Sequence, residues 1–478
     1  MRKLILGVIL MLLSAGLSAA QPASTLSPAV RAFVSVDAPV LALTHVRVID
    51  GTGAAAVEDQ TIVVDSGRIT AVGRSGDIKV PAGAKVLDLQ GNTVIPGIVG
   101  MHDHIFYPSG AGGALYNDLA FSAPRLYLAG GVTTIRTTGS LEPYTDLNLK
   151  RAIDSGRVPG PKMHVTGPYL EGPGAMTLQM HELTGPEDAR KMVEYWAGQG
   201  VTSFKAYMHI TRAELATVVE AAHKLGLKVT GHLCSIGFRE AATLGIDDLE
   251  HGLVVDTEFV PTKKPDTCPP TQENNASIAK LDLEGAPARE MIRDLVQHHV
   301  SITSTLPVFE TFLPNRPPLE QRILDAMLPE ARIDYLARRT RLAETPGSFN
   351  VEMFKKEMQF EHEFAQAGGL LIAGLDPTGY GGVIPGFGDQ REIELLVEAG
   401  FTPVEAIKIA TSNGAEFLGE RDHIGTLVAG KQADMVVVQG DPSKTIFDIK
   451  KVALVFKDGV GYDPGKLIDS VRGMVGLR

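Results

Sequence analysis

The sequence predicts an α/β protein, a (β/α)8 TIM barrel joined to a small β-sandwich that both chain ends build. In the middle of the 478-residue chain, short apolar runs alternate with helical segments, the pattern of a parallel sheet with crossover helices. Both ends instead show alternating apolar residues and glycine turns, which favour antiparallel strands. Histidine, lysine and aspartate stand where the apolar runs end, and a parallel barrel collects its functional groups at that edge.

The N-terminal segment has the order of charges and apolar residues that directs a chain to export. Arg2 and Lys3 precede the apolar run Leu4–Leu13, and small residues follow at 18–20. This order is typical of a secretory signal peptide in residues 1–20 and predicts a periplasmic or secreted protein. The alternative is an N-terminal membrane anchor, but the run is short for spanning a bilayer. We therefore expect cleavage and no membrane insertion of the mature chain.

The β-sandwich domain is expected from two segments far apart in the sequence. Residues 21–37 are predicted to be an N-terminal tail. Residues 38–95 and 422–465 then show alternating apolar positions between Asp-Gly and Ser-Gly turns. Two unrelated terminal sheets are the alternative, and they would leave exposed strand edges. Pairing of both segments in one sandwich is therefore favoured.

The barrel domain is expected from residues 96–421. Its strands are predicted at 93–101, 132–138, 162–169, 201–207, 227–232, 247–251, 299–305 and 370–375. Several helical segments between these strands end in glycine, which is a common helix C-cap signal. Eight strands with intervening helices fit a (β/α)8 barrel.

Two connections in the barrel domain are long, 253–290 and 306–352. Long connections on the functional rim commonly form lids or substrate walls. The first contains Cys268, and the other cysteine, Cys234, lies just past a predicted strand end. An exported protein can keep a disulfide, so a bridge that pins this loop is one interpretation and two free thiols are the other.

The charge balance of the chain restricts its partners. The sequence has 45 Lys and Arg against 56 Asp and Glu, a formal net charge of −11. This balance argues against nucleic acid and anionic membrane surfaces as partners. A small-molecule partner is expected, and a homo-oligomer is compatible with the sequence.

Four histidines are candidate metal ligands. His102 and His104 stand two apart on a predicted strand, so their side chains point to the same face and can bind one ion. His232 and His251 end later strands, and neutral imidazole is a good ligand for zinc and similar metals. For each histidine alone, a structural role is the alternative interpretation.

Lys205 and Asp376 complete the candidate set. An ammonium group has no lone pair, but a lysine that has reacted with carbon dioxide becomes a carbamate whose two oxygens can bridge two cations. The alternative for Lys205 is an ion pair near the rim. Asp376 can bind a metal and take a proton from a bridging water, whose pKa two ions can lower to about 7. The alternative for Asp376 is a loop cap before Pro377.

The chain resembles the amidohydrolase superfamily, in its two-metal branch with a carboxylated lysine. The resemblance runs from about residue 40 to 460 and rests on PGIVGMHDH, EHG, and IKIATSNGAEFLG followed by IGTLVAGKQADMVVVQGDP. The stretch GFREAATLGIDDLEHG is most similar to imidazolonepropionase-like and Xaa-Pro dipeptidase-like members, whereas SFKAYM is similar to hydantoinases and dihydroorotases. The resemblance implies two divalent metal ions, most simply zinc, and a carbamylated Lys205.

Substrate-binding candidates are polar side chains close in sequence to the metal ligands: Tyr207, His209, Tyr169, His181, Arg136 and Tyr380. Tyrosine, histidine or arginine there could bind a substrate carboxylate or stabilise an oxyanion. Packing or salt-bridge support of the barrel is the alternative for Tyr169 and Arg136.

The expected activity is hydrolysis of amide bonds in dipeptides or N-acyl amino acids. A metal-bridging hydroxide would attack the carbonyl, and Asp376 would carry the proton to the leaving nitrogen. SFKAYM favours hydrolysis of cyclic amides as an alternative, and aminohydrolase action on a ring is a third, which Lys205 disfavours. A catalytically silent metal-binding protein on the same scaffold is the alternative outside enzymes, and a metal and amidase assay distinguishes it.

Overall fold

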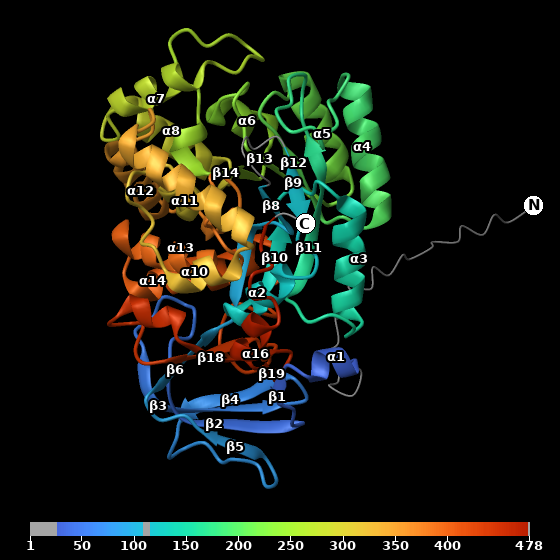
Figure 1. Ribbon diagram of the computed structural model, residues 1–478, viewed down its shortest axis with the longest axis vertical. Coiled ribbons are helices and arrows are strands. Elements are labelled where there is room, and N and C mark those ends of the chain that lie inside the picture. Colours follow the sequence, from blue (N-terminus) through green and yellow to red (C-terminus); the bar gives the residue numbers. More distant parts are fainter. Residues whose placement is uncertain (1–25, 109–114, 477–478) are drawn as a thin grey trace, which may run out of the picture.

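The predicted fold class is confirmed by the computed structural model, which describes residues 26–108 and 115–476. An eight-stranded parallel barrel surrounded by helices stands next to a separate sheet made from the two chain ends (Figure 1). The expected signal peptide lies outside the described residues. Among the helices that are described, none is long and apolar enough to cross a membrane.

The barrel contains eight parallel strands in chain order around the sheet. They are β7 (Ile98–Asp103), β10 (Val132–Thr137), β11 (Lys162–Leu170), β12 (Ser203–Ala206), β13 (Lys228–Gly231), β14 (Asp248–Glu250), β15 (Ser301–Ser304) and β16 (Leu371–Ala373). The last strand lies beside the first and so closes the barrel. Just past β16, the Asp376 amide donates a hydrogen bond of 2.9 Å to the carbonyl of His102 on β7. Two predicted metal ligands therefore meet where the barrel closes.

Helices cover the outside of this barrel. They are α2 (Ala123–Ala129), α3 (Pro143–Asp154), α4 (Pro186–Gln199), α5 (Arg212–Lys224), α6 (Phe238–Leu244), α8 (Ala286–Gln297), α12 (Val351–Gln366) and α13 (Phe387–Glu398). Helix α5 begins with a capping box between Thr211 and Glu214, which satisfies free amides of its first turn. Gly200 and Gly245 end α4 and α6 with φ of 101° and 92°, left-handed values that glycine adopts without strain. The predicted glycine caps are thus confirmed at these two helices.

The long connections form structured walls on the rim at the carboxyl ends of the strands. The first holds η2 (Gly252–Val255) and α7 (Thr271–Lys280), and the second holds α9 (Leu306–Glu310), α10 (Gln321–Ala326) and α11 (Pro329–Glu344). Strands β8 (Phe106–Pro108) and β9 (Tyr116–Asp118) form a short pair on the same rim. Cys234 and Cys268 form a disulfide with a Cα–Cα distance of 4.9 Å, which decides between the two interpretations that the sequence left open. It ties the first long connection to the end of β13.

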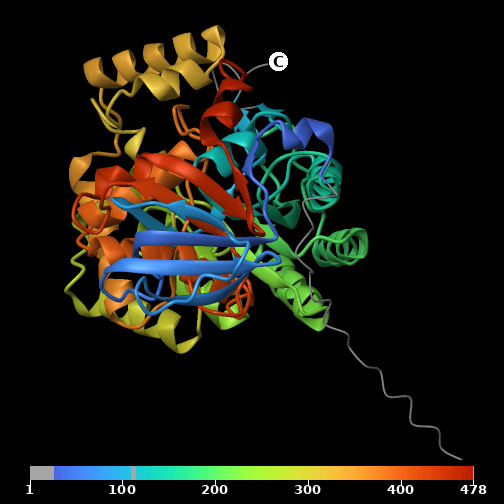
Figure 2. The ribbon, with the colours of Figure 1, turned by 90° about the horizontal axis from the view of Figure 1, so that it is seen from below.

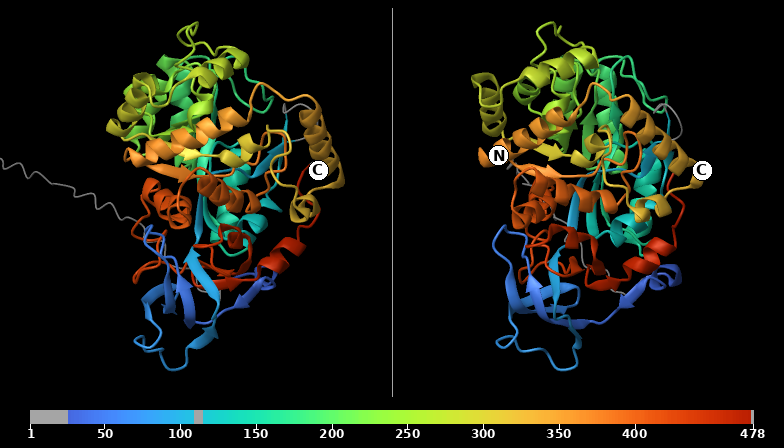
Figure 3. Two further views of the ribbon diagram at one scale, coloured as in Figure 1. Left: turned by 90° about the vertical axis from the view of Figure 1, so that its left-hand side faces the viewer. Right: turned by 60° about the vertical axis from the view of Figure 1, so that its left-hand side comes forward.

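The terminal sheet has nine strands from both ends of the chain. They are β1 (Val34–Val36), β2 (Val40–Val48), β3 (Val57–Asp65), β4 (Arg68–Arg74), β5 (Lys85–Asp88), β6 (Asn92–Pro96), β17 (Met435–Gln439), β18 (Val452–Lys457) and β19 (Val460–Tyr462). Figure 2 shows N-terminal strands in blue beside C-terminal strands in red, and Figure 3 shows this layer below the barrel. The pairing of β6 with β17 joins the two ends, and Val94, Val437 and Phe456 lie in the core between them.

The chain returns from the barrel to the terminal sheet through short helical segments. These are α14 (Pro403–Lys408), η3 (Ile409–Asn413) and α15 (Gly414–Phe417), and the C-terminal half of the sheet carries η4 (Ile446–Lys450) and α16 (Pro464–Asp469). The helix α1 (Pro28–Arg31) and β1 precede the first long strand. The predicted tail at 21–37 is therefore wrong for its second half, because Val30 and Val36 are buried.

The predicted single strand at 93–101 is divided between the two sheets. β6 belongs to the terminal sheet and β7 to the barrel, and Gly97 lies between them. A side chain at Gly97 would collide with Thr133, so only glycine permits this close passage. The apolar run continues through the junction, and the sequence pattern therefore hides the break.

Candidate active site

The six predicted metal ligands all lie at the carboxyl end of the barrel strands. His102 lies on β7, with His104 just after it, and Lys205 lies on β12. His232 follows β13, His251 follows β14, and Asp376 comes three residues after β16. The structure brings these residues together from five different strands.

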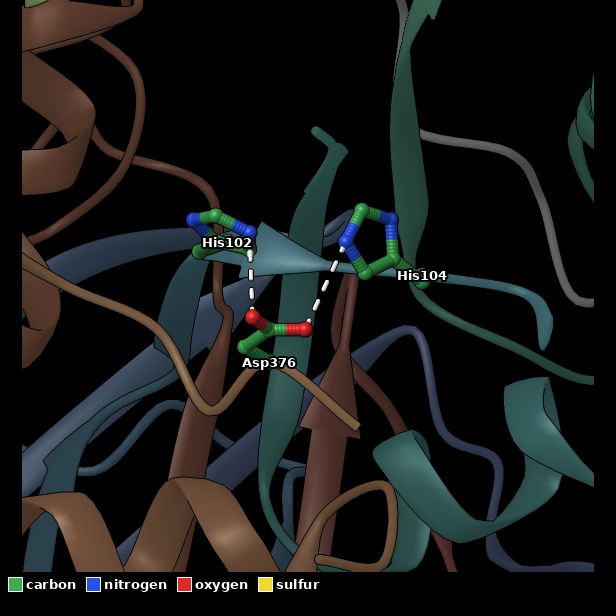
Figure 4. Close-up of side chains that lie close together, drawn as sticks. All are labelled: His102, His104 and Asp376. Carbon is green, nitrogen blue, oxygen red and sulfur yellow. Dashed lines mark ion pairs between the residues drawn. The ribbon is translucent and has the colours of Figure 1, made fainter. Parts of the chain in front are cut away.

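His102, His104 and Asp376 form the centre of the group (Figure 4). His102 Nε2 lies 3.7 Å from Asp376 Oδ2, and His104 Nε2 lies 3.7 Å from Asp376 Oδ1. One potential ligand atom from each residue lies within 4.8 Å of the others. Zinc binds nitrogen and oxygen ligands at about 2.0–2.2 Å, so ligand atoms of one ion lie roughly 3–4 Å apart. The spacing of the three residues fits this requirement.

The other three candidates surround this centre. Lys205 Nζ lies 3.1 Å from His102 Nε2, and His251 Nε2 lies 3.9 Å from Asp376 Oδ2. The ring of His232 is 4.4 Å from the ring of His251 between centroids. All six groups therefore face one small region.

Hydrogen bonds behind the histidines fix which nitrogen faces the centre. His102 Nδ1 contacts Glu250 Oε2 at 2.8 Å, and His104 Nδ1 contacts the Gly139 carbonyl at 3.2 Å. A carboxylate and a carbonyl only accept hydrogen bonds, so Nδ1 carries the hydrogen in both rings. The lone pair is then on Nε2, directed toward Asp376. This is the arrangement that metal-binding histidines adopt.

A buried ion-pair network supports Glu250 from inside the barrel. Arg136 Nη2 donates to Glu250 Oε1 and Asp248 Oδ2, both at 3.0 Å, and Arg136 Nε donates to the Met101 carbonyl at 2.7 Å. Each of the three charged side chains is at most 1% exposed. A buried charge of this kind is tolerated only when it is paired and hydrogen-bonded. Arg136 therefore supports Glu250 beneath the ligands and does not line the cavity.

Burial shifts the titration of the candidate ligands in directions that suit metal binding. Burial, reinforced by the charge of Lys205, lowers the pKa of His102 and His104 well below the usual range and that of His232 to about 3. These rings are thus neutral ligands at physiological pH. Burial also lowers the pKa of Lys205 to about 8 and raises that of Asp376 to about 6.

Two of the candidate ligands have left-handed backbone conformations. The φ angles are 71° at His251 and 49° at Asp376. Such values are uncommon for residues other than glycine, and they cluster at functional sites where the surroundings enforce them. Asp376 Oδ1 is also buried without a hydrogen-bond partner among the described residues. An unsatisfied carboxylate oxygen 3.7 Å from His104 Nε2, on a side chain whose other oxygen lies 3.7 Å from His102 Nε2, fits a divalent cation.

A cavity of about 290 Å³ opens directly above this group. Its lining includes His104, Lys205, His232, His251 and Asp376 together with many aromatic and aliphatic side chains. The disulfide between Cys234 and Cys268 forms part of the wall. The size and the apolar lining are those of a small-molecule site.

The predicted substrate-binding residues divide into two groups. Tyr169 and Tyr207 line the cavity, with ring centroids 4.8 Å apart, and Tyr169 Oη lies 3.5 Å from His104 Nε2. His181 lies outside it and pairs with Asp188 at 3.0 Å. Of these three residues, the structure therefore places the two tyrosines at the cavity and His181 away from it.

His209 and Tyr380 also lie outside the cavity lining. His209 Nδ1 lies 3.3 Å from Glu171 Oε2, and Tyr380 is exposed on the rim, with its ring 4.8 Å from that of Phe312. Both residues follow strand ends in the sequence, but the loops that carry them direct their side chains away from the cavity. Sequence proximity to a ligand therefore did not suffice to predict a pocket position.

Several residues of the candidate site are not predicted from the sequence. Glu250 was missed, although its position directly before His251 was a signal, because carboxylates commonly orient metal-binding histidines. The aromatic residues Phe309, Phe312 and Phe349 in the cavity wall were also missed. They come from the second long connection, whose path the sequence pattern does not define.

Comparisons with known proteins agree with this geometry. The model of the amidohydrolase family matches residues 93–304 and 320–461. An allantoinase from Streptomyces avermitilis is 33% identical over 172 residues, which are 35% of this chain and 33% of that protein. The chain thus matches only a third of the length of this curated relative.

Solved structures resemble the chain over most of its length. A candidate prolidase from Bifidobacterium longum has a TM-score of 0.64 and 25% identity, covering 90% of this chain and 98% of its own. A Xaa-Pro dipeptidase with bound methionine has a TM-score of 0.65 and 21% identity, covering 89% and 100%. The second likeness concerns the fold. The family match covers well over half of the sequence, and the chain therefore belongs to the amidohydrolase family.

Proposed function

We propose that this protein is an exported, metal-dependent hydrolase of linear amide bonds, of the kind found in dipeptides and N-acyl amino acids. The observation that carries the proposal is the convergence of His102, His104 and Asp376 at the floor of an apolar cavity. Lys205, His232 and His251 surround the same point. Similarity to a candidate prolidase and a Xaa-Pro dipeptidase supports linear amides as the substrate class.

The proposed cofactors are two divalent ions, most simply zinc, with Lys205 as a carbamate. His102, His104, His232, His251 and Asp376 would hold the ions together with the carbamate oxygens. Burial lowers the pKa of Lys205 to about 8, which raises the fraction of neutral amine that can react with carbon dioxide. When bound, such ions lower the pKa of water to about 7 and polarise a carbonyl group.

The residues of the chain then perform three tasks. The buried imidazoles remain neutral ligands. Asp376 takes the proton of the attacking water and passes it to the leaving nitrogen, as general base and then general acid. Tyr169 and Tyr207 line the cavity, where their hydroxyl groups would donate hydrogen bonds to the oxygen of the scissile carbonyl.

Hydrolysis of cyclic amides is the second candidate function. SFKAYM around Lys205 and the match to an allantoinase favour it. The prolidase-like structures cover far more of the chain, and they favour linear amides.

A screen of zinc-loaded protein against dipeptides, N-acyl amino acids and cyclic amides tests the proposal. The expected result is release of free amine from linear amides, abolished by a chelator and by Asp376→Asn. Turnover confined to cyclic amides would favour the second candidate. Stable metal binding without turnover of any amide would instead indicate a catalytically silent protein.

Export to the periplasm or the medium is proposed from the first twenty residues and from the disulfide. Disulfides persist in oxidising compartments and are rare in the bacterial cytosol. The Cys234–Cys268 bridge therefore supports the signal peptide predicted in residues 1–20. N-terminal sequencing of the exported fraction should find a mature chain that begins near Gln21. Met1 retained in that fraction would contradict cleavage.

A further inference from the structure

The cavity above the candidate metal group has little charge. Among the described residues that line it, Lys205 is the only lysine or arginine and Asp376 the only aspartate or glutamate, and the histidines there are candidate metal ligands. Both belong to the candidate metal centre. Residues 109–114, which the structure does not describe, contain no charged side chain in the sequence. The part of the cavity that would hold the substrate therefore offers no cation to a substrate carboxylate.

Aromatic side chains pack against two of the candidate ligands, His104 and His251. Phe106 stacks on His104 at 4.3 Å between ring centroids, and Tyr116 lies 5.1 Å from Phe106. At the second ligand, the ring of Phe309 lies 5.6 Å from that of His251, and the ring of Phe349 lies 5.8 Å from that of Phe309. A scissile bond held between these ligands would thus have an aromatic wall beside each of its two substituents.

Two cations close to the cavity lie outside its lining. Lys263 Nζ donates to the carbonyls of Cys234, Ser235 and Thr267 at 3.0, 2.6 and 3.2 Å. Arg338 lines a smaller, separate hollow that also contains Asp334. Neither side chain is part of the cavity lining.

Resting on the proposed hydrolysis of linear amides, we propose that, within that class, the preferred substrates are not free dipeptides or N-acyl amino acids but uncharged amides with an aromatic or bulky apolar group on both sides of the scissile bond. In the reaction, the C–N bond breaks, a new C–O bond forms from water, and the proton of that water goes to the leaving nitrogen. A carboxylate in this cavity would lose its hydration with only neutral hydrogen-bond donors, such as Thr271 and Asn275, and no ion pair to compensate. Substrates with a free carboxylate next to the amine should therefore react more slowly.

A matched pair of substrates tests this inference on the zinc-loaded full-length mature protein. N-benzoyl-2-phenylethylamine and N-benzoylphenylalanine have the same scissile bond and the same two rings, and they differ only in one carboxylate. We expect kcat/KM to be at least about tenfold higher for the uncharged amide, a ratio that corresponds to about 1.4 kcal/mol. Replacing benzoyl by acetyl should lower kcat/KM of the uncharged amide by about the same factor.

A variant that adds one cation to the cavity gives a second readout. Thr271 is an exposed residue of the lining at the start of α7, and Gln272 is its exposed neighbour outside the lining. Thr271→Lys should reduce the preference for the uncharged amide about tenfold, mainly by lowering KM for the acid. Gln272→Lys adds the same charge outside the cavity and should leave the preference unchanged. If both variants change this preference equally, or if neither changes it, the absence of a cation from the cavity does not explain the preference, and the inference is contradicted.

The outcomes separate this inference from the proposed function. Equal or faster cleavage of N-benzoylphenylalanine overturns the inference and leaves amide hydrolysis intact. If N-benzoylphenylalanine is the faster substrate and Arg338→Gln abolishes that preference, the substrate carboxylate binds in the smaller hollow that Arg338 lines. Cleavage of other linear amides but of neither test compound also overturns the inference. Failure to cleave any linear amide, with metal bound, overturns the proposed function itself.

Discussion

Glu250 Oε2 lies 2.8 Å from His102 Nδ1, and this contact turns His102 Nε2 toward Asp376. Burial alone would raise the pKa of Glu250, but Arg136 and Lys205 lower it below the usual range, so the side chain remains a carboxylate. The ring of His102 is thereby held in one tautomer and one orientation. Arg136, Glu250 and His102 form a chain of contacts from the barrel interior to the site.

Glu250→Ala should weaken metal binding without removing any proposed ligand. Loss of such a supporting carboxylate typically costs about 10- to 100-fold in metal affinity, because the histidine is no longer oriented. Zinc affinity measured by competition with a chromogenic chelator checks this. Glu187→Ala, which removes an exposed carboxylate on α4, is the matched control. Unchanged zinc affinity in Glu250→Ala would show that the contact has no role in positioning His102.

Lys205→Ala should lose both bound metal and activity. The substitution removes the amine that would form the bridging carbamate, and a short carboxylic acid in the buffer should partly restore both properties by replacing it. Lys228→Ala, at the exposed start of the neighbouring strand β13, removes a lysine that is not a candidate ligand and should behave like the wild type. Crystallographic density for an unmodified lysine in active, metal-loaded enzyme would refute the bridging role.

Replacement of both Cys234 and Cys268 by serine should lower stability and leave the metal centre intact. The bridge closes a loop with a sequence separation of 34 residues, and the chain-entropy model assigns such a loop up to about 4 kcal/mol of unfolding free energy. The cavity wall contributed by this loop should loosen, so KM should rise while metal content stays constant. Thermal unfolding, zinc content and KM on one preparation check this. An unchanged melting temperature would contradict a stabilising role for the bridge.

The candidate ligands could be predicted from the sequence because each of them stands at or just past the end of a barrel strand. The apolar runs before His102, Lys205 and His251 are short and bounded, and a barrel places all such ends on one face. The division of the run at Gly97 could not be predicted, because it results from tertiary contact with Thr133.

The side chains of the cavity wall were harder to predict than the candidate ligands, for a similar reason. Arg136 alternates with outward-facing residues on β10, and the sequence does not show whether an inward side chain lies in the cavity or beneath it. Phe309 and Phe349 reach the cavity only through the tertiary path of the second long connection. Such placements depend on packing between distant segments and leave no local pattern.

Asp376→Asn should impair chemistry more than metal binding. Asparagine keeps the shape and an oxygen for the metal, but it has no basic site for the proton. We expect kcat to fall by roughly 10² or more, the usual size of a general acid–base contribution. A carboxylate acts as a base above its pKa, so this function is lost as the pH falls, and the acidic limb of the pH–rate profile should change in the variant.

The competing interpretation is that Asp376 only caps the loop before Pro377. In that case Asp376→Asn would lower the melting temperature and leave kcat within a few-fold of the wild type. Measuring kcat, metal content and melting temperature on the same preparation distinguishes the two. Near-normal turnover would remove Asp376 from the mechanism.

Metal content measured together with activity tests the central claim most directly. Protein stripped with a chelator and then titrated with zinc should regain amidase activity in proportion to bound metal, up to about two ions per chain. Elemental analysis of each titration point gives the ratio. Full activity in protein that contains almost no metal would contradict the account.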